Sequence, residues 1–236
     1  MDLICIQCAA MAARFDMQGE NVIETCPGRQ PTNNEKLYRW SSWQPKTPFA
    51  PTWDCPMYMD TVDSALCNTI LTGLTKIEEK IGHWTTYNFF LTDDPIALQL
   101  KERIKESLYE FGDELKITFS DQLWIRGWMH CTKIGEKLPI HSHSMHENTF
   151  LSGNLLLHNS NIQTEYIIPH YSTYCGNFKP EAKCGKMLWF PSWVEHYVPE
   201  CNENRYSIAW DIYTNEAMEY MAENHPEDSM SLSCLL

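Results

Sequence analysis

Basic residues are scarce in this chain, and no segment concentrates them. Eighteen Lys and Arg residues stand against 31 Asp and Glu residues, which gives a formal net charge of -13. Because phosphate contacts depend on Lys and Arg, this balance argues against nucleic-acid binding. Long apolar runs are missing as well, and without roughly eighteen consecutive apolar residues the sequence predicts no membrane span.

Regular cysteine spacing is also lacking. The ten cysteines are scattered and match no small secreted disulfide scaffold, so we interpret them as mostly reduced thiols. Cys5 and Cys8 form a CxxC pair, but no second pair follows at zinc-finger distance. We therefore favour two small apolar residues over half a zinc site or a redox pair. Residues 1–13 include Asp2 and no basic residue, which is atypical of a signal peptide.

The first half of the chain contains two amphipathic patterns. Apolar residues recur every three or four positions over residues 60–81 and again over 95–111, which predicts two helices. Asp94-Pro95 supplies an N-cap and a first-turn proline for the second helix, and Gly112 is a plausible stop. Residues 14–58 are rich in Pro, Asn, Thr and Trp, which indicates an irregular aromatic segment packed over a core.

Beyond Lys116 the pattern changes to short aromatic or β-branched runs separated by Gly, Pro, Asn and Ser. The predicted strands are residues 123–131, 150–157, 165–168, 186–190, 196–198 and 206–213. We expect one structural domain of the α+β class, mainly β, in which helices support a barrel or sandwich. It divides into an N-terminal extension with supporting helices (1–115), a β core (116–214) and an acidic tail (215–236). The tail is expected to be one helix that ends frayed.

Histidines are the densest chemical feature of the β half. His141 and His143 share one face if their segment is extended, as Pro139 favours. His196, which begins a later predicted strand, can complete a face of three imidazoles on one metal ion. Imidazole suits iron, copper, nickel and zinc, so these ligands alone do not select the metal.

The same loop leaves other ligand sets open. His143 and His146 would share a face if the segment were helical, and Glu147 could turn two histidines into a 2-His-1-carboxylate site. We therefore keep His146 and Glu147 as reserve ligands behind His141, His143 and His196.

Arg205 and Ser207 follow on the next predicted strand. Strand alternation places Arg205, Ser207 and Asp211 on one side. A planar guanidinium close to a metal is suited to clamp a carboxylate, so this pattern indicates an organic-acid cosubstrate.

Together these passages resemble the iron(II)- and 2-oxoglutarate-dependent dioxygenase superfamily. They resemble most closely a family of 2-oxoglutarate oxygenases from marine bacteria and their phages. The resemblance covers about residues 120–214. The matching pieces are His141-x-His143, Leu151-Ser152-Gly153-Asn154, Gly185 with Phe190-Pro191-Ser192-Trp193-x-x-His196-x-Val198-Pro199, and Arg205-Tyr206-Ser207-Ile208. Residues 1–115 match only loosely.

The resemblance implies a double-stranded β-helix, also called a jelly roll or cupin-like fold. It implies iron(II) on His141, His143 and His196, and 2-oxoglutarate held by Arg205 with Ser207. It assigns no catalytic residue beyond the metal ligands. The implied reaction is hydroxylation of a small-molecule or peptide substrate with release of succinate and CO2, in the cytoplasm of a bacterium or a phage-infected host cell.

The chain departs from the superfamily at His143, where Asp is usual, and this leaves a neutral face of three imidazoles. An aromatic lining for the site is expected from Trp124, Trp128 and Trp189, although these residues could equally belong to the core. Neither the substrate nor the oligomeric state follows from the sequence.

Two other functions fit the same fold. A metal-binding cupin matches Gly135, His141, His143 and Glu147, although Trp193 stands where cupins carry Gly. A jelly-roll interaction protein without catalytic activity is the second alternative. Arg205 discriminates among them, because a 2-oxoglutarate enzyme needs a carboxylate clamp and the alternatives do not.

Overall fold

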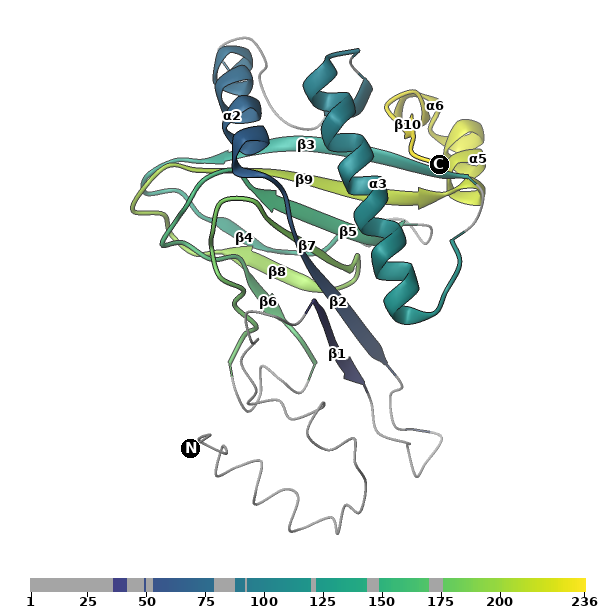
Figure 1. Cartoon of the computed structure of the whole chain (residues 1–236). Helices are drawn as coiled ribbons and strands as arrows, with labels where there is room; N and C mark the ends of the chain where they lie inside the picture. The colour runs from purple at the N-terminus through teal and green to yellow at the C-terminus, as the bar shows by residue number, and fades with distance from the viewer. Residues whose placement is uncertain are drawn as a thin grey trace.

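Two antiparallel sheets form the centre of the molecule in the computed structural model (Figure 1). The structure describes residues 36–41, 49, 53–78, 88–91, 93–119, 122–143, 149–169 and 176–236. The reserve ligands His146 and Glu147, and the pair Cys5 and Cys8, lie outside these residues. None of the helices in the described ranges is long and apolar enough to cross a membrane.

The large sheet has seven strands in the order β1-β2-β7-β5-β9-β3-β10, and the small sheet has the order β4-β8-β6. The large-sheet strands are β1 (Leu37–Ser41), β2 (Asp54–Thr61), β3 (Leu123–Thr132), β5 (Thr149–Leu156), β7 (Lys186–Pro191), β9 (Arg205–Thr214) and β10 (Ser233–Cys234). The small-sheet strands are β4 (Leu138–His141), β6 (Glu165–Ile167) and β8 (Glu195–Val198). All six strands predicted after residue 116 are confirmed within two residues, as is the mainly β fold class.

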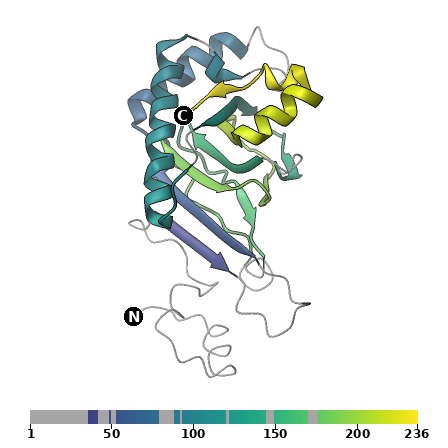
Figure 2. The same ribbon diagram turned by 90° about the vertical axis from the view of Figure 1, so that its right-hand side faces the viewer.

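Helices cover one face of the large sheet (Figures 1 and 2). They are α2 (Ser64–Glu78), the short 3-10 helix η2 (Phe89–Leu91) and α3 (Pro95–Leu115). Ile104 and Leu108 of α3 are fully buried in one cluster with sheet residues such as Trp189 and Trp210. This apolar layer fixes the large sheet and leaves its opposite face turned toward the small sheet.

Strand alternation determines which side chains reach the space between the sheets. Leu123 and Ile125 of β3 are buried in the helix-side core, whereas Trp128 of the same strand lines a cavity on the other face. On β9, Ile208 and Ile212 likewise pack in the helix-side core. The two strands therefore form both part of the core and one wall of the cavity.

Gly153 of β5 is one position where only glycine fits. Its register partners are Trp189 on β7 and Trp210 on β9. A Cβ added at Gly153 would lie 2.5 Å from the ring of Trp210, well inside van der Waals contact. The absence of a side chain thus lets two large indoles pack beneath the central strand.

The predicted helix stop at Gly112 is wrong, because α3 continues to Leu115. Gly112 is buried, and a Cβ there would lie 2.7 Å from the ring of Phe119. Lys116 ends the helix in a left-handed conformation with φ 57°. Gly112 therefore serves close packing rather than termination.

The N-cap prediction is confirmed, because Asp94 Oδ1 accepts a hydrogen bond of 2.8 Å from the backbone N–H of Ile96.

The predictions for the N-terminal half also need correction. Within residues 14–58 the described part contains β1 and the start of β2, which pair with each other in the large sheet. The helix expected from residue 60 begins at Ser64, since residues 60 and 61 still belong to β2, which pairs with β7. Long-range strand pairing overrides the weak local pattern here.

The tail is not a single helix with a frayed end. It forms α5 (Asn215–Asn224), α6 (Pro226–Ser229) and β10, and β10 pairs with β3 at the edge of the large sheet. Met221 and Leu232 pack with Tyr213 in a small core of their own. The tail therefore covers one end of the sheet and contributes to the cavity.

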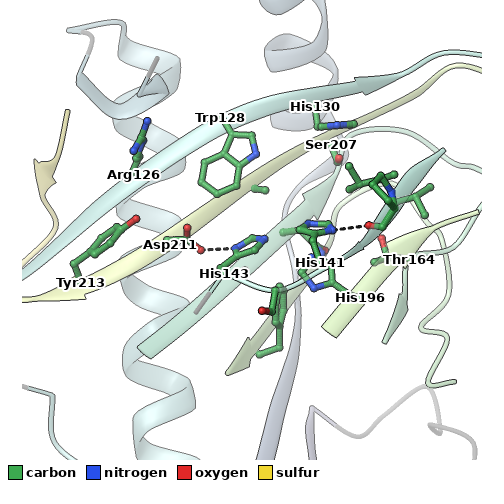
Figure 3. Close-up of a pocket in the computed structure, with 18 of the residues that line it drawn as sticks. Arg126, Trp128, His130, His141, His143, Thr164, His196, Ser207, Asp211 and Tyr213 are labelled. Atoms are coloured by element: carbon green, nitrogen blue, oxygen red, sulfur yellow. Dashed lines mark hydrogen bonds and ion pairs between the residues drawn. The ribbon is translucent and has the colours of Figure 1, made fainter. Parts of the chain in front are cut away.

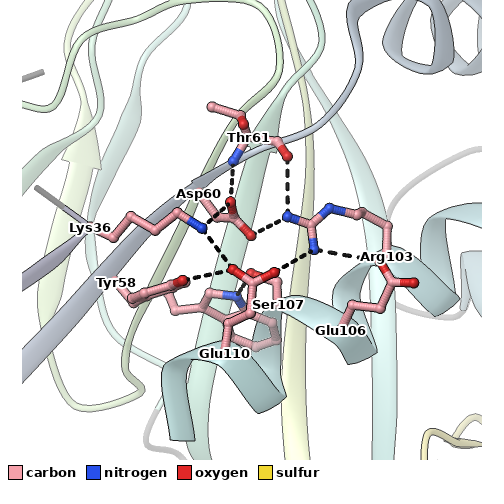
Figure 4. Close-up of polar contacts among 9 residues, drawn as sticks. Lys36, Tyr58, Asp60, Thr61, Arg103, Glu106, Ser107 and Glu110 are labelled. Atoms are coloured by element: carbon pink, nitrogen blue, oxygen red, sulfur yellow. Dashed lines mark hydrogen bonds and ion pairs between the residues drawn. The ribbon is translucent and has the colours of Figure 1, made fainter. Parts of the chain in front are cut away.

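A polar network connects α3 to β2 on the helix-covered face of the large sheet (Figure 4). Arg103 pairs with the buried carboxylate of Asp60, and Lys36 lies 3.3 Å from the same group. Burial raises the pKa of Asp60, but hydrogen bonds from Ser107 and Thr61 and the two cations outweigh it and hold that pKa below its ordinary value. The network holds a structural carboxylate in its charged form.

Candidate active site

Three histidines from separate segments meet between the sheets (Figure 3). His141 ends β4 and is the cross-strand partner of His196 on β8. His143 follows β4, where its backbone N–H donates to the Ser192 carbonyl at 2.9 Å. One ligand nitrogen from each ring lies within 4.8 Å of the other two. The structure thus brings together the three residues that the sequence singled out.

Each imidazole is held by its Nδ1 atom. His141 Nδ1 lies 2.8 Å from the Pro139 carbonyl oxygen, and His196 Nδ1 lies 3.0 Å from the Val194 carbonyl oxygen. Since a carbonyl can only accept, both Nδ1 atoms carry the proton. Nε2 of each ring therefore keeps its lone pair, which is how metal-binding histidines are normally oriented.

His143 is oriented by a carboxylate instead. Its Nδ1 lies 2.6 Å from Oδ1 of Asp211, a buried residue of β9. The Ser152 hydroxyl also donates to this oxygen at 2.6 Å, and Ser192 lies 2.9 Å from Ser152. The carboxylate of Asp211 therefore supports His143 from behind and is not itself part of the potential metal-ligand set.

Burial determines the charge of His141 and His196. Desolvation lowers the pKa of His196 to about 3, and the neighbouring His141 and His143 act in the same direction. Desolvation likewise lowers the pKa of His141. Both rings are consequently neutral near pH 7, and neutral imidazole is the form that binds a metal.

Arg205 lies deep in the same cavity and is only 5% exposed. Its acceptors are all uncharged: Thr164 Oγ1 at 2.8 Å, Ser207 Oγ at 3.2 Å and the Ile162 carbonyl oxygen at 3.4 Å. Within the described ranges no carboxylate lies at ion-pair distance from it. Burial lowers the pKa of this guanidinium below its ordinary value. A buried cation without an acidic partner is costly, so this site favours an anion.

The cavity that joins these groups has a volume of about 560 Å³. Ser207 and Thr164 line one part of it, and the histidines line the middle (Figure 3). Arg205 lies beside Ser207 and Thr164, because it donates hydrogen bonds to both. Trp128 lines it as predicted, and its ring centroid lies 5.6 Å from that of His143.

The expected aromatic lining is only partly right. Trp189 is fully buried on the helix side, where its indole N–H donates to Ser107 at 3.0 Å. Trp124 packs against the tail helices instead of the cavity. Trp124 shares the face of Trp128 by alternation, but it lies toward the end of β3 that the tail covers.

Sequence reasoning missed several lining residues. The sequence pattern places Asp211 on the correct face without assigning it a role, and the motifs above do not include His130 or Thr164. His130 is the cross-strand partner of Ser207. Burial lowers its pKa, and the charge of Arg205 adds to this effect. The two-residue alternation through Arg126, Trp128 and His130 could have identified it, whereas Thr164 lies outside any strand and leaves no such signal.

Comparison with known proteins identifies the fold. No protein-family model and no curated protein sequence matches this chain. Among solved structures, a prolyl-4-hydroxylase from Pseudomonas putida is similar, with a TM-score of 0.53 and 12% identity over 67% of this chain and 88% of that one. A prolyl hydroxylase from Trichoplax adhaerens, in complex with a hypoxia inducible factor peptide fragment, gives 0.53 and 11% identity over 68% and 84%.

A third similar structure is the epimerase SnoN in complex with Fe3+, alpha ketoglutarate and nogalamycin RO. It has a TM-score of 0.51 and 8% identity over 66% of this chain and 78% of that one. At such low identity the likeness concerns architecture alone. The chain therefore has the double-stranded β-helix fold that these non-haem oxygenases share.

Proposed function

We propose that this protein is an iron(II)- and 2-oxoglutarate-dependent dioxygenase that uses His141, His143 and His196 as metal ligands. The observation that carries the proposal is the buried Arg205, which lines the same cavity as three converging imidazoles and has only uncharged partners among the described residues. The narrower resemblance to the marine bacterial and phage family stays a prediction.

The donor set fits iron. Three imidazole rings on one face leave the other side of an ion open, as a non-haem oxygenase requires. Asp211 supplies the negative charge behind His143 that a carboxylate ligand would otherwise bring into the first coordination shell. Iron(II), when bound, supplies the redox chemistry that dioxygen activation requires.

2-Oxoglutarate fits the end of the cavity that Arg205 lines. A distal carboxylate would receive hydrogen bonds from the guanidinium, and the Ser207 and Thr164 hydroxyls can donate to it as well. This anion would give Arg205 the charged partner that it lacks in the described part of the chain. The 2-oxo acid end would then point toward the histidines.

In the proposed reaction, 2-oxoglutarate loses CO2 and becomes succinate. One oxygen atom of dioxygen enters the new succinate carboxylate, and the other converts a substrate C–H bond to C–OH. Trp128 and the buried setting of His196 limit water near the reacting groups. Similarity to a prolyl hydroxylase in complex with a peptide fragment and to an epimerase in complex with nogalamycin RO supports either substrate class. We propose a cytoplasmic location because the six described cysteines are free thiols.

Succinate release tests the proposal. The full-length protein with iron(II), 2-oxoglutarate and ascorbate should form succinate in air, slowly without a substrate and faster when a substrate is present. The variants His196→Ala and Arg205→Met should reduce this rate to background. Glu165→Gln is a matched control, because Glu165 bonds Lys179 and Tyr197 away from the cavity.

Other outcomes separate the alternatives. Tight metal binding without 2-oxoglutarate turnover would indicate a metal-only cupin. Neither metal binding nor turnover would indicate an interaction protein that keeps the jelly-roll fold.

A further inference from the structure

The cavity extends past the histidines to a second pair of charged side chains that the proposed function does not use. Arg126 of β3 and Asp228 of α6 both line it. Arg126 Nη1 lies 3.9 Å from Asp228 Oδ1, at the outer limit of an ion pair and beyond hydrogen-bond range. The two side chains are 19% and 44% exposed. We call Arg126 and Asp228 the charged pole.

The charged pole lies at the opposite end of the cavity from Arg205. On the ladder between β3 and β9, Arg205 pairs with Thr132, and Asp211 pairs with Arg126. Six residues of strand span roughly 20 Å, far more than the length of a five-carbon dicarboxylate. Figure 3 shows Arg126 on one side of the three histidines and Thr164 on the other. A cosubstrate held by Arg205 therefore leaves the charged pole open to another ligand.

Apolar groups line the wall beside the charged pole. They are Trp128, Tyr213, Met221 and Leu232. Trp128 also stands beside His143, so this surface continues from the charged pole to the metal-binding face. A ligand with a charged head and an apolar body matches this order of groups.

The signs of the charges select the head group. A simple anion on Arg126 would meet Asp228 at short range and a chain of net charge -13 at long range. A simple cation on Asp228 would meet Arg126. A zwitterion places its carboxylate on Arg126 and its ammonium on Asp228, so that each end of the head group meets a side chain of opposite charge.

Asp211 is a second carboxylate close to Arg126 along the ladder between β3 and β9. It is the cross-strand neighbour of Arg126, but its Oδ1 accepts from both His143 and Ser152. Asp211 thereby supports the histidine face, and Asp228 is the carboxylate of the charged pole.

We propose that the charged pole binds the α-carboxylate and α-ammonium groups of a free amino acid whose apolar side chain extends along Trp128 toward the three histidines. The identification of this amino acid as the substrate rests on the proposed function, whereas its binding does not. The side-chain carbons would then be the positions open to hydroxylation.

Calorimetric titration of the full-length, metal-free protein tests the proposal. The probes are L-leucine, L-isoleucine, L-valine, L-methionine and L-phenylalanine. At least one should bind, and both its N-acetyl derivative and its amide should bind at least about tenfold more weakly, since each lacks one charge. If none of the five binds, or if the blocked derivatives bind equally well, the proposal is wrong.

Variants locate the binding site. Arg126→Gln and Asp228→Asn should each weaken the best amino acid about tenfold or more. The matched controls are Arg39→Gln and Asp54→Asn, which break an exposed ion pair on β1 and β2 and should leave affinity unchanged. If Arg126→Gln and Asp228→Asn lower thermal stability but retain affinity, the pair is only a structural tether for α6 and the proposal falls.

Succinate release without added substrate keeps the two proposals separate. Succinate formation together with no amino-acid binding would overturn the charged pole and leave the dioxygenase standing. Amino-acid binding that depends on Arg126 and Asp228, together with no succinate, would support the charged pole and overturn the dioxygenase.

Discussion

Asp211 offers the sharpest test of how the histidine face is held. Its carboxylate is the acceptor for His143 Nδ1 at 2.6 Å, and it also accepts from Ser152. Asp211→Asn keeps an oxygen that can accept from His143 but removes the charge. Asp211→Ala removes both and leaves two buried donors without this acceptor. Loss of such outer partners commonly weakens metal affinity about 10- to 100-fold, so we expect about 10-fold for Asn and nearer 100-fold for Ala.

Competition with a chromophoric chelator for Co(II) measures these affinities directly. Circular dichroism should show that both variants keep their fold, and Glu165→Gln should bind Co(II) like the wild type because it alters a carboxylate outside the cavity. An Asp211→Ala protein that is folded and binds Co(II) within about twofold of the wild type would refute the reasoning.

Two further predictions concern stability, and urea unfolding measures both. Asp60→Asn should cost about 1–3 kcal/mol at pH 7, because it removes the charge that Arg103 and Lys36 face. Since the folded pKa of Asp60 is depressed, this contribution is present above about pH 4 and is lost as the pH falls further. A difference that stays constant from pH 7 to pH 3 would contradict this assignment. Gly153→Ala should cost about 1–3 kcal/mol, since its Cβ would lie 2.5 Å from Trp210, and an unchanged unfolding midpoint would show that the sheet relaxes freely.

The sequence predicts those parts of the fold that depend on local pattern. β9 is dense in β-branched and aromatic residues, and burial alternates regularly along the first half of β3. The same alternation correctly places Arg205 and Ser207 on one face, where both line the cavity. These positions follow from a period of two and need no knowledge of tertiary structure.

The remaining features depend on contacts between distant segments. β1 and β2 become strands because β2 pairs with β7, more than 120 residues later. The contact between His143 and Asp211 joins residues 68 positions apart, and the registers of β9 with β3 and β5 decide it. Arg126 and Asp228 meet because the tail folds back over β3. No local pattern encodes such distances.

An anaerobic titration of 2-oxoglutarate into the iron(II)-loaded protein tests the central claim most directly. Chelation of iron by a 2-oxo acid gives a visible charge-transfer absorption, which should saturate in the wild type. Arg205→Met should still show the band but with a dissociation constant raised at least about 30-fold, because loss of one partner of a buried charge pair costs about 2 kcal/mol or more. No band in the wild type, or equal dissociation constants for both proteins, would contradict a shared site of three imidazoles and a carboxylate clamp.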